Sequence, residues 1–365
     1  MKKRFLFNYT LLIVLIYFFS SPAFHLQLLD SWYIQNLHYI ADNFFSQFDR
    51  LVNISHRVLF PLLLLLFKKY FFFNYLSYEI VHIFLVNLFI LFIILFTYRH
   101  FLKLNKNYAL NYTLLLCSSY ICIGSTSFPY YPDTLTVSLL ILAYIFATKN
   151  YIISSVFIFL SFLSHEMAIL GSLLIFYTQY INNQKKINII FLYLLFVFSY
   201  LFFIFFIKNH INQTYSNFYE TEFLFSFSLN KYLEHLKTTV NLVYAGNFFS
   251  FKAIWFLVIF SFLNYKRVFS NYFNFNIYLF LVIIVLFFNF SYQTDVSRHI
   301  SVLLFIVIFS ICEKFSKLKK YNTLVKYLSF FQLLIPNIYI WNSQSYFVNP
   351  LIIELIVKSI LDLFN

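Results

Sequence analysis

The sequence predicts an all-α fold: a polytopic membrane helix bundle of about eleven or twelve transmembrane helices, with the N-terminus in the cytoplasm. Two features of the composition support this prediction, because hydrophobic residues make up 61% of the 365 residues and charged residues only 11%. No water-soluble packing of such a chain could bury so much apolar surface. The third observation is the alternation of long apolar runs with short basic segments, which is typical of multi-pass membrane proteins.

The first apolar run covers residues 5–21 and follows Lys2, Lys3 and Arg4. A secretory signal peptide is the alternative, but the run lacks a small-residue cleavage site and many further apolar runs follow it. We therefore expect a retained first helix whose basic end lies in the cytoplasm.

The remaining crossings are predicted from apolar runs that are long enough, or that carry aromatic and basic residues which reach the interface. In chain order the predicted spans are 5–21, 77–98, 108–125, 133–148, 151–164, 167–181, 187–207, 251–265, 276–292, 299–312 and 323–341. A twelfth segment, 350–364, repeats Glu354, Lys358 and Asp362 along one helical face. That pattern fits a helix lying in the interface at least as well as one that crosses.

The segment 57–72 is a special case, because its apolar run is short and ends at Lys68 and Lys69. If it crossed, the basic cluster that includes Arg99 and Lys103 would move outside, against the positive-inside rule. We therefore expect it to lie along, or dip into, the outer face, as an interfacial helix of the first outer loop. The long outer loops are then 22–76 and 208–250, and residues 1–365 form one transmembrane domain without a separate soluble domain.

This topology sorts the charges between the two sides of the membrane. The inner loops hold most of the lysines and arginines, and Glu313 is their one carboxylate. The outer segments collect Asp30, Asp42, Asp49, Asp133, Glu166, Glu220, Glu222, Glu234 and Asp295. We therefore expect the functional site on the extracytoplasmic side of the membrane.

The same composition argues against several functions. The net charge of +13 is spread over short loops rather than gathered on one stripe, so no nucleic-acid partner is expected. Three glycines leave no Gly-rich phosphate loop, and the three cysteines have no metal-ligand or disulfide spacing.

The first outer loop carries the leading candidate, Asp30, about one turn beyond the first helix. An ionised Asp there could take a proton from a hydroxyl acceptor or hold a divalent cation, although a solvated acid beside an interfacial Trp32 anchor is the plain alternative. Asp42 and Asp49 could supply a second carboxylate. Arg57 offers a planar set of donors for phosphate oxygens, or simply reaches lipid phosphates.

Three further groups lie at predicted outer helix ends. Asp133 follows two prolines and either caps the next helix or lines an outer cavity. The adjacent His165 and Glu166 are costly at membrane depth unless they are paired or face water. The last group consists of Asp295, Arg298 and His299. Here Asp295 either caps a helix and pairs with Arg298, or orients it toward a lipid-linked phosphate.

These pieces, in this order, resemble the GT-C superfamily of integral membrane glycosyltransferases. The resemblance is carried by Asp30-Ser31-Trp32-Tyr33, His56-Arg57-Val58-Leu59-Phe60-Pro61, Tyr131-Pro132-Asp133-Thr134, Ser164-His165-Glu166-Met167 and the segment from Asp295 to His299. It implies transfer of a sugar from a polyprenyl-phosphate or diphosphate donor to a hydroxyl acceptor, in the synthesis of a cell-surface glycan or glycolipid. The implied partners are the lipid-linked donor, a glycan or lipid acceptor and membrane lipids.

The resemblance also implies roles for the residues. Asp30 would be the general base or a metal ligand, with a divalent cation as the one cofactor to consider. Arg57 and Arg298 would hold the donor phosphate, and His165, Glu166 and His299 would line the pocket. The chain departs from the family where Ser31 stands in place of a paired acid, and in lacking a soluble domain after the last helix.

Two other functions remain open. An O-antigen or capsule polymerase also has many spans, long outer loops and outward arginines. A lipid-linked sugar flippase or transporter would place its charged residues at mid-membrane on broken helices. For all three we expect a multi-pass protein of a bacterial plasma (inner) membrane.

Overall fold

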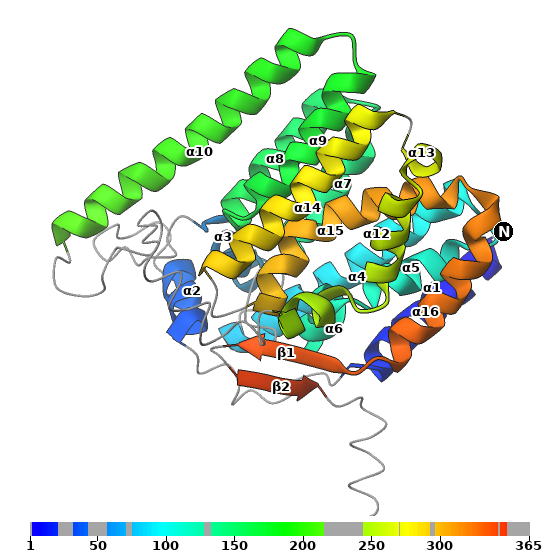
Figure 1. Cartoon of the computed structure of the whole chain (residues 1–365). Coiled ribbons are helices and arrows are strands. Elements are labelled where there is room, and N and C mark those ends of the chain that lie inside the picture. Colours follow the sequence, from blue (N-terminus) through cyan, green and yellow to red (C-terminus); the bar gives the residue numbers. More distant parts are fainter. Residues whose placement is uncertain are drawn as a thin grey trace, which may run out of the picture. The chain divides into compact units, whose positions relative to one another are not determined.

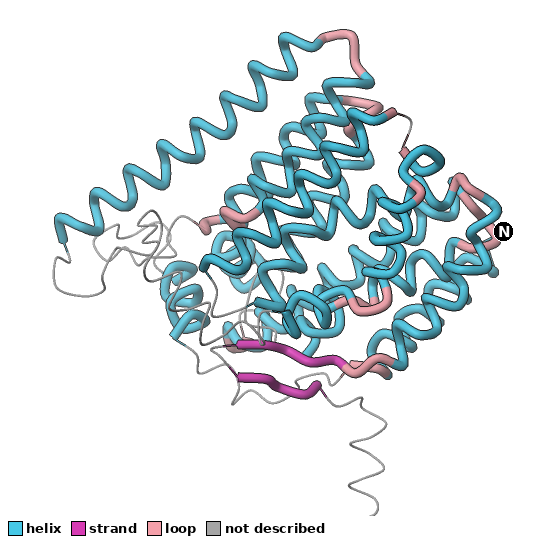
Figure 2. Tube along the Cα trace, viewed as in Figure 1, coloured by secondary structure: helices cyan, strands magenta, loops and turns pink. Residues whose placement is uncertain are grey.

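The computed structural model describes residues 2–20, 32–42, 57–70, 75–127, 133–214, 244–269, 271–292, 296–341 and 344–348. These residues are mostly helical, with one small β-hairpin (Figure 2). The chain divides into two compact units. Unit 1 comprises residues 1–24, 88–129 and 235–365, and unit 2 comprises residues 25–87 and 130–234. Each unit is described by itself.

Unit 2 holds α2 (Trp32–Asp42), α3 (Leu59–Tyr70), the first part of α4 (Tyr78–Leu104), α7 (Asp133–Phe146), α8 (Tyr151–Ser164), α9 (Ala168–Asn182) and α10 (Lys186–Thr214). Helices α7, α8 and α9 pack on one another, and α10 lies along α8 and α9 (Figure 1). Helix α3 contacts both α2 and α8. Short connections between α7, α8 and α9 favour this antiparallel packing of sequence neighbours.

The side chain of Asn150 explains why α8 begins where it does. Its carboxamide oxygen accepts hydrogen bonds from the backbone N–H groups of Ile152 and Ile153, at 3.1 and 3.2 Å. This N-cap satisfies donors that the first helical turn cannot pair internally. The turn between α7 and α8 is therefore fixed by a local contact.

Unit 1 holds α1 (Lys2–Phe18), the rest of α4, α5 (Ala109–Cys117), α6 (Tyr120–Ser127), the helical segment Tyr244–Phe251, α12 (Ile254–Leu263), α13 (Tyr265–Val268), α14 (Tyr272–Tyr292), α15 (Val296–Ser316), the short η3 (Lys319–Tyr321), α16 (Asn322–Leu334), β1 (Asn337–Trp341) and β2 (Gln344–Val348). Helix α15 is its core element, because α14, α12, α6 and β1 all pack against it. In the apolar stretch of α15, 83% of the residues are buried.

Several described helices suit a membrane. Three helices, Tyr78–Leu104, Lys186–Phe206 within α10 and Ser297–Ser316 within α15, are long and apolar enough to cross it. A fourth span results if Tyr244–Phe251 and Ile254–Leu263, which meet at 94°, count as one. Most of the described side chains that α10 exposes are apolar, among them Phe191, Phe198, Phe202, Phe205 and Phe206. Such a surface is stable against lipid and unstable in water.

The predicted number of crossings is not settled by these helices. Helices α7, α8 and α9 contain only 14, 14 and 15 residues. At about 1.5 Å per residue they are shorter than a hydrocarbon core of about 30 Å. The total of eleven or twelve spans therefore stays a prediction, as does the joining of both units into one transmembrane domain.

Two predicted spans need correction. The segment 323–341 is helical only to Leu334, and β1 pairs antiparallel with β2, with Asn337 opposite Val348. Pro336 explains the change, because proline disfavours a helical conformation in the residue before it, and Ile335 is extended. The fold is consequently not purely α-helical.

The second correction concerns 108–125, which forms α5 and α6 rather than one helix. The hydroxyl of Ser119 donates to the carbonyl of Leu116 at 2.6 Å, and this bond competes with continuation of the helix. The first outer loop does contain two helices, α2 and α3, and their place at the interface stays a prediction. The doubtful segment 350–364 lies outside the described residues.

Candidate functional site

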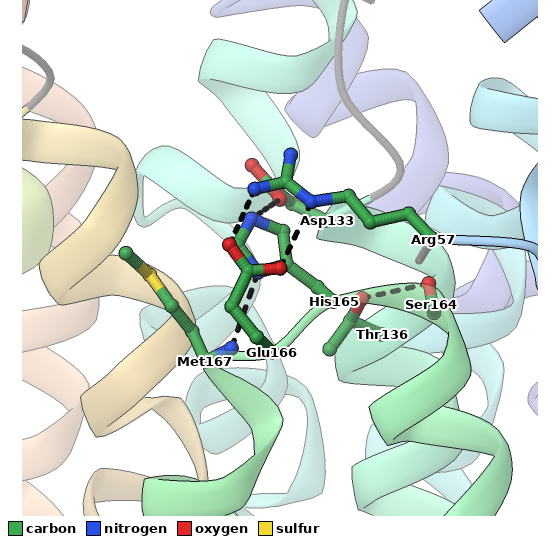
Figure 3. Close-up of polar contacts among 7 residues, drawn as sticks. All are labelled: Arg57, Asp133, Thr136, Ser164, His165, Glu166 and Met167. Atoms are coloured by element: carbon green, nitrogen blue, oxygen red, sulfur yellow. Dashed lines mark hydrogen bonds and ion pairs between the residues drawn. The ribbon is translucent and has the colours of Figure 1, made fainter. Parts of the chain in front are cut away.

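Four of the predicted site residues meet in unit 2, although three separate segments carry them. Arg57 lies two residues before α3, Asp133 is the first residue of α7, and His165 with Glu166 lies in the turn between α8 and α9. Figure 3 shows their side chains pointing toward one another. We call these four residues the unit 2 charged cluster.

The strongest contact in the cluster joins Arg57 to Glu166. The guanidinium donates from Nε to Oε2 at 2.9 Å and from Nη2 to Oε1 at 2.5 Å. The side chains are 11% and 19% exposed, so this bidentate pair is the part of the cluster that reaches the surface. Two parallel hydrogen bonds of this kind fix the orientation of both side chains. Because both groups are charged, each bond is stronger than a hydrogen bond between neutral groups.

His165 lies behind this pair and is fully buried. Its Nδ1 atom accepts a hydrogen bond from the backbone N–H of Met167 at 3.2 Å, so in the neutral ring the hydrogen resides on Nε2. That Nε2 atom lies 3.7 Å from Oδ1 of Asp133. The Oε2 atom of Glu166 lies 3.4 Å from Nδ1. The imidazole thus stands between two carboxylates.

Local structure explains the placement of His165. The residue ends α8 in an extended conformation, with φ −160° and ψ 130°, and the chain turns there into α9. The hydroxyl groups of Thr136 and Ser164 lie 2.9 Å apart and join α7 to α8 just below the turn (Figure 3). The acid of Asp133 belongs to the first turn of α7, where negative charge interacts favourably with the helix dipole.

The charge balance of the cluster limits its chemistry. It contains one cation, Arg57, and two carboxylates, so it carries one net negative charge with a neutral His165 and none with a protonated one. The Nε–Nη2 edge of Arg57 is occupied by Glu166, and a phosphate would have to compete for it. The cluster is therefore better suited to accept a hydrogen bond from a hydroxyl group than to bind a free phosphate.

A tyrosine of α10 belongs to the same neighbourhood and was not predicted. Tyr200 is fully buried, its ring packs on Phe162 with centroids 5.8 Å apart, and the charges of Glu166 and Arg57 both act on its hydroxyl. Within the described residues that hydroxyl has no hydrogen-bond partner. One tyrosine among 31 in an aromatic-rich chain gives no signal in the sequence.

Three of the other predicted residues are described, and they belong to other helices. Arg298, which is 5% exposed, and the half-buried His299 belong to the first turns of α15 in unit 1. Asp42 is the exposed last residue of α2 in unit 2. Asp30, Asp49 and Asp295 lie outside the described residues. A single pocket shared by all these residues stays a prediction.

A histidine pair in unit 2 was also missed. His38 Nε2 and His82 Nδ1 lie 3.3 Å apart, and His38 Nδ1 lies 3.6 Å from Oε1 of Glu79. Burial lowers the pKa of the His38 imidazole below its usual range, although the negative charges of Glu79 and Asp42 oppose that shift. Across the described part of the chain, no three His, Cys, Asp or Glu side chains are arranged to hold a metal ion.

Unit 1 contains a buried lysine that sequence reasoning also missed. Lys252 lies at the 94° break between Tyr244–Phe251 and α12, is 1% exposed and has a positive φ of 48°. Its ammonium donates to Oδ1 of Asn337 and to the carbonyl of Gln332. In the sequence, Lys252 looks like an interfacial residue at the start of an apolar run.

Comparisons with protein-family models, with curated proteins and with solved structures find no match to this chain.

Proposed function

We propose that this chain is a membrane glycosyltransferase that moves a sugar from a polyprenyl-phosphate or diphosphate donor to a hydroxyl acceptor on the extracytoplasmic side. The observation that carries the proposal is the unit 2 charged cluster. Its members come from three segments that the charge sorting had assigned to the outer side, and each segment belongs to a motif of the GT-C resemblance. Their meeting in one polar group supports a shared role.

The proposed chemistry follows from the leaving group. A lipid phosphate departs readily, so the reaction needs a base for the acceptor hydroxyl and stabilisation of the departing charge more than it needs an acid. Asp30 is the proposed base. Glu166, the most exposed carboxylate of the cluster, would accept a hydrogen bond from a sugar hydroxyl.

The buried members of the cluster have supporting roles in this proposal. Asp133 and His165 lie behind Glu166, and Arg57 holds its carboxylate in one orientation. They are positioning residues, because a fixed carboxylate orients a bound sugar better than a mobile one. A divalent cation held by Asp30, which lies outside the described residues, stays a prediction.

Sugar transfer can be measured with the purified full-length protein in lipid nanodiscs. The donors are a panel of polyprenyl phosphates that carry radiolabelled hexoses or pentoses, and the acceptors are glycolipids and oligosaccharides. The proposal predicts transfer from at least one donor, with a loss of about a hundredfold or more in Asp30→Asn. Undiminished transfer in that variant would remove Asp30 from the mechanism, and the absence of transfer from every donor would contradict the proposal.

A second function, a lipid-linked sugar flippase, is favoured by one specific observation. A buried lysine at a sharp break in an apolar helix is the kind of feature that transporters use for anionic substrates. Proteoliposomes with a fluorescent lipid-linked sugar test it, since dithionite quenches only the outer leaflet. The flippase function predicts quenching beyond half of the fluorescence, reduced in Lys252→Met, whereas the transferase function predicts no difference from empty liposomes.

A further inference from the structure

A cavity of about 300 Å³ lies in unit 1, between the N-terminal half of α1 and the C-terminal half of α4. Its lining residues are Arg4, Phe5, Asn8, Tyr98, Leu102 and Lys106. The carboxamide of Asn8 donates to the Tyr98 hydroxyl at 2.8 Å, which joins the two helices at the base of the cavity. The side chains of Arg4 and Lys106 are exposed. We call this cavity the α1–α4 pocket.

The two cations of the α1–α4 pocket have no anionic partner within the described residues. Neither Arg4 nor Lys106 takes part in an ion pair there. A third cation is close, because the guanidinium of Arg99 lies over the ring of Phe5, 5.8 Å from its centroid. Three positive charges at one end of two packed helices repel one another unless an anion joins them.

The described residues of unit 1 have no unpaired carboxylate at this place. Glu313 is the one carboxylate among the described residues of unit 1. Its oxygens are already engaged by His100 Nε2 at 3.2 Å and by Lys317 Nζ at 2.8 Å. A balancing anion for the pocket therefore comes from outside the described residues of unit 1.

We propose that the α1–α4 pocket binds a phosphate group, and that the phosphate belongs to the headgroup of an anionic lipid. A guanidinium and an ammonium are the side chains that recognise phosphate oxygens, and the tyrosine hydroxyl and asparagine amide add neutral hydrogen-bonding groups. The volume accommodates a phosphoglycerol group, being at the lower end of the range for small-molecule sites.

The walls of the pocket favour a lipid over a free ion. Phe5 and Leu102 provide apolar surface beside the cations, as a glycerol backbone and the start of an acyl chain require. The basic N-terminus of α1 is predicted to face the cytoplasm, where basic pockets between helices bind anionic headgroups. This site is distinct from the unit 2 charged cluster, and it does not depend on the proposed sugar transfer.

Native mass spectrometry of the full-length protein, released from detergent with defined lipids, tests the proposal. Phosphatidylglycerol is compared with phosphatidylcholine, and inorganic phosphate is added in a separate arm. The proposal predicts selective retention of phosphatidylglycerol, weakened about tenfold or more in the double variant Arg4→Gln/Lys106→Gln. Arg4→Lys, which keeps the charge, should retain most of the binding.

Lys326→Gln is the matched control, because Lys326 is an exposed lysine of unit 1 outside the pocket. Its affinity for phosphatidylglycerol should stay within about twofold of wild type. Displacement of the lipid by millimolar inorganic phosphate would support the phosphate chemistry but overturn the lipid as its source. Equal losses in the control and the double variant, or unchanged binding in a double variant of normal thermal stability, would overturn the site itself.

Discussion

The carboxylate of Glu166 is held from two sides, since Arg57 occupies both of its oxygens and the imidazole of His165 lies beside one of them. Burial of any one of these side chains alone would carry a large desolvation free energy, and their mutual contacts offset part of it. Truncation of Arg57 or Glu166 alone therefore leaves the other charge buried without this ion pair, whereas truncation of both removes the two charges together. This asymmetry makes the cluster open to test by stability measurements.

Arg57→Ala, Glu166→Ala and the double variant form a thermodynamic cycle. We expect the pair to show a coupling free energy of roughly 1–3 kcal/mol in unfolding experiments, because both side chains are largely buried and doubly hydrogen-bonded. The i,i+4 pair of Glu313 and Lys317 is the control, because the Lys317 side chain is 58% exposed, and its coupling should be below about 0.5 kcal/mol. Equal couplings in both cycles would argue against the special stability of the cluster.

Tyr200 allows a similar comparison within one helix. Its hydroxyl has no hydrogen-bond partner in the described part of the chain, whereas the hydroxyl of Tyr193 lies 2.9 Å from Oγ of Ser172. Tyr193→Phe should reduce the free energy of unfolding by about 1 kcal/mol, and Tyr200→Phe should leave it unchanged or raise it. If the Tyr200 hydroxyl meets substrate, the Tyr200→Phe variant alone should lose sugar transfer, by about tenfold. Normal transfer in Tyr200→Phe would leave the hydroxyl without a role.

At the scale of the elements, contacts between side chains decide where helices end and how they meet. His38 of α2 contacts His82 and Glu79 of α4, its ring stacks on Tyr78, and the ring of Phe60 from α3 packs edge-on against His82. Three helices thus meet around two imidazoles. The charge on His38 should therefore influence how firmly α2 is attached.

The pH dependence follows from the pKa of His38, which burial lowers in the folded protein. The unfolded chain then binds a proton at a higher pH than the folded one, so stability rises with pH in between. The stabilising contribution of neutral His38 to the free energy of unfolding should be fully present above about pH 6.5. It should be lost as the pH falls toward the pKa of His38 in the folded protein. Thermal unfolding from pH 5 to 8 should show a steeper acid loss in wild type than in His38→Gln. The same slope in both proteins would contradict this assignment.

The helix ends also show which parts of the fold the sequence could predict. Apolar runs predicted the positions of α4, α7, α8, α9 and α10 to within several residues, because hydrophobicity decides what must leave water. The break at Ser119 and the strand after Pro336 were not predicted. Both depend on local backbone competition that an apolar run conceals.

The candidate site was predictable in its residue types but not in its pairing. An ionisable residue at a helix end in an apolar chain is costly, and this cost drew attention to Asp133, His165 and Glu166. That Arg57 would pair with Glu166 depends on the packing of α3 against α8, which no local pattern encodes. Lys252 was missed because its asparagine partner is 85 residues away in the chain.

For the whole molecule, the sorting of charges across the membrane is the prediction on which the rest depends. Helix α3 has 12 residues, about 18 Å at 1.5 Å per residue, which is short for a crossing. If α3 stays on the outer side, the loop after it is outside and the loop between α7 and α8 is inside. If α3 crossed the membrane instead, the basic C-terminal end of α4 would lie outside.

Cysteine labelling of intact cells tests this topology. The three native cysteines are buried, so they give little background. Tyr75→Cys, at a position that is 99% exposed, should react with a membrane-impermeant maleimide, and Lys149→Cys should react only after the cells are opened. The reverse pattern would mean that α3 crosses the membrane.

The most direct test of the central claim is the rate of sugar transfer by Glu166→Gln, since Glu166 is the most exposed carboxylate of the unit 2 charged cluster. Glu79→Gln is the matched control, because Glu79 is a carboxylate of the same unit outside the cluster. With the donor that wild type uses, we expect transfer to fall about tenfold or more in Glu166→Gln and by less than about twofold in Glu79→Gln. Wild-type transfer by a folded Glu166→Gln protein would contradict the claim that the cluster serves the reaction.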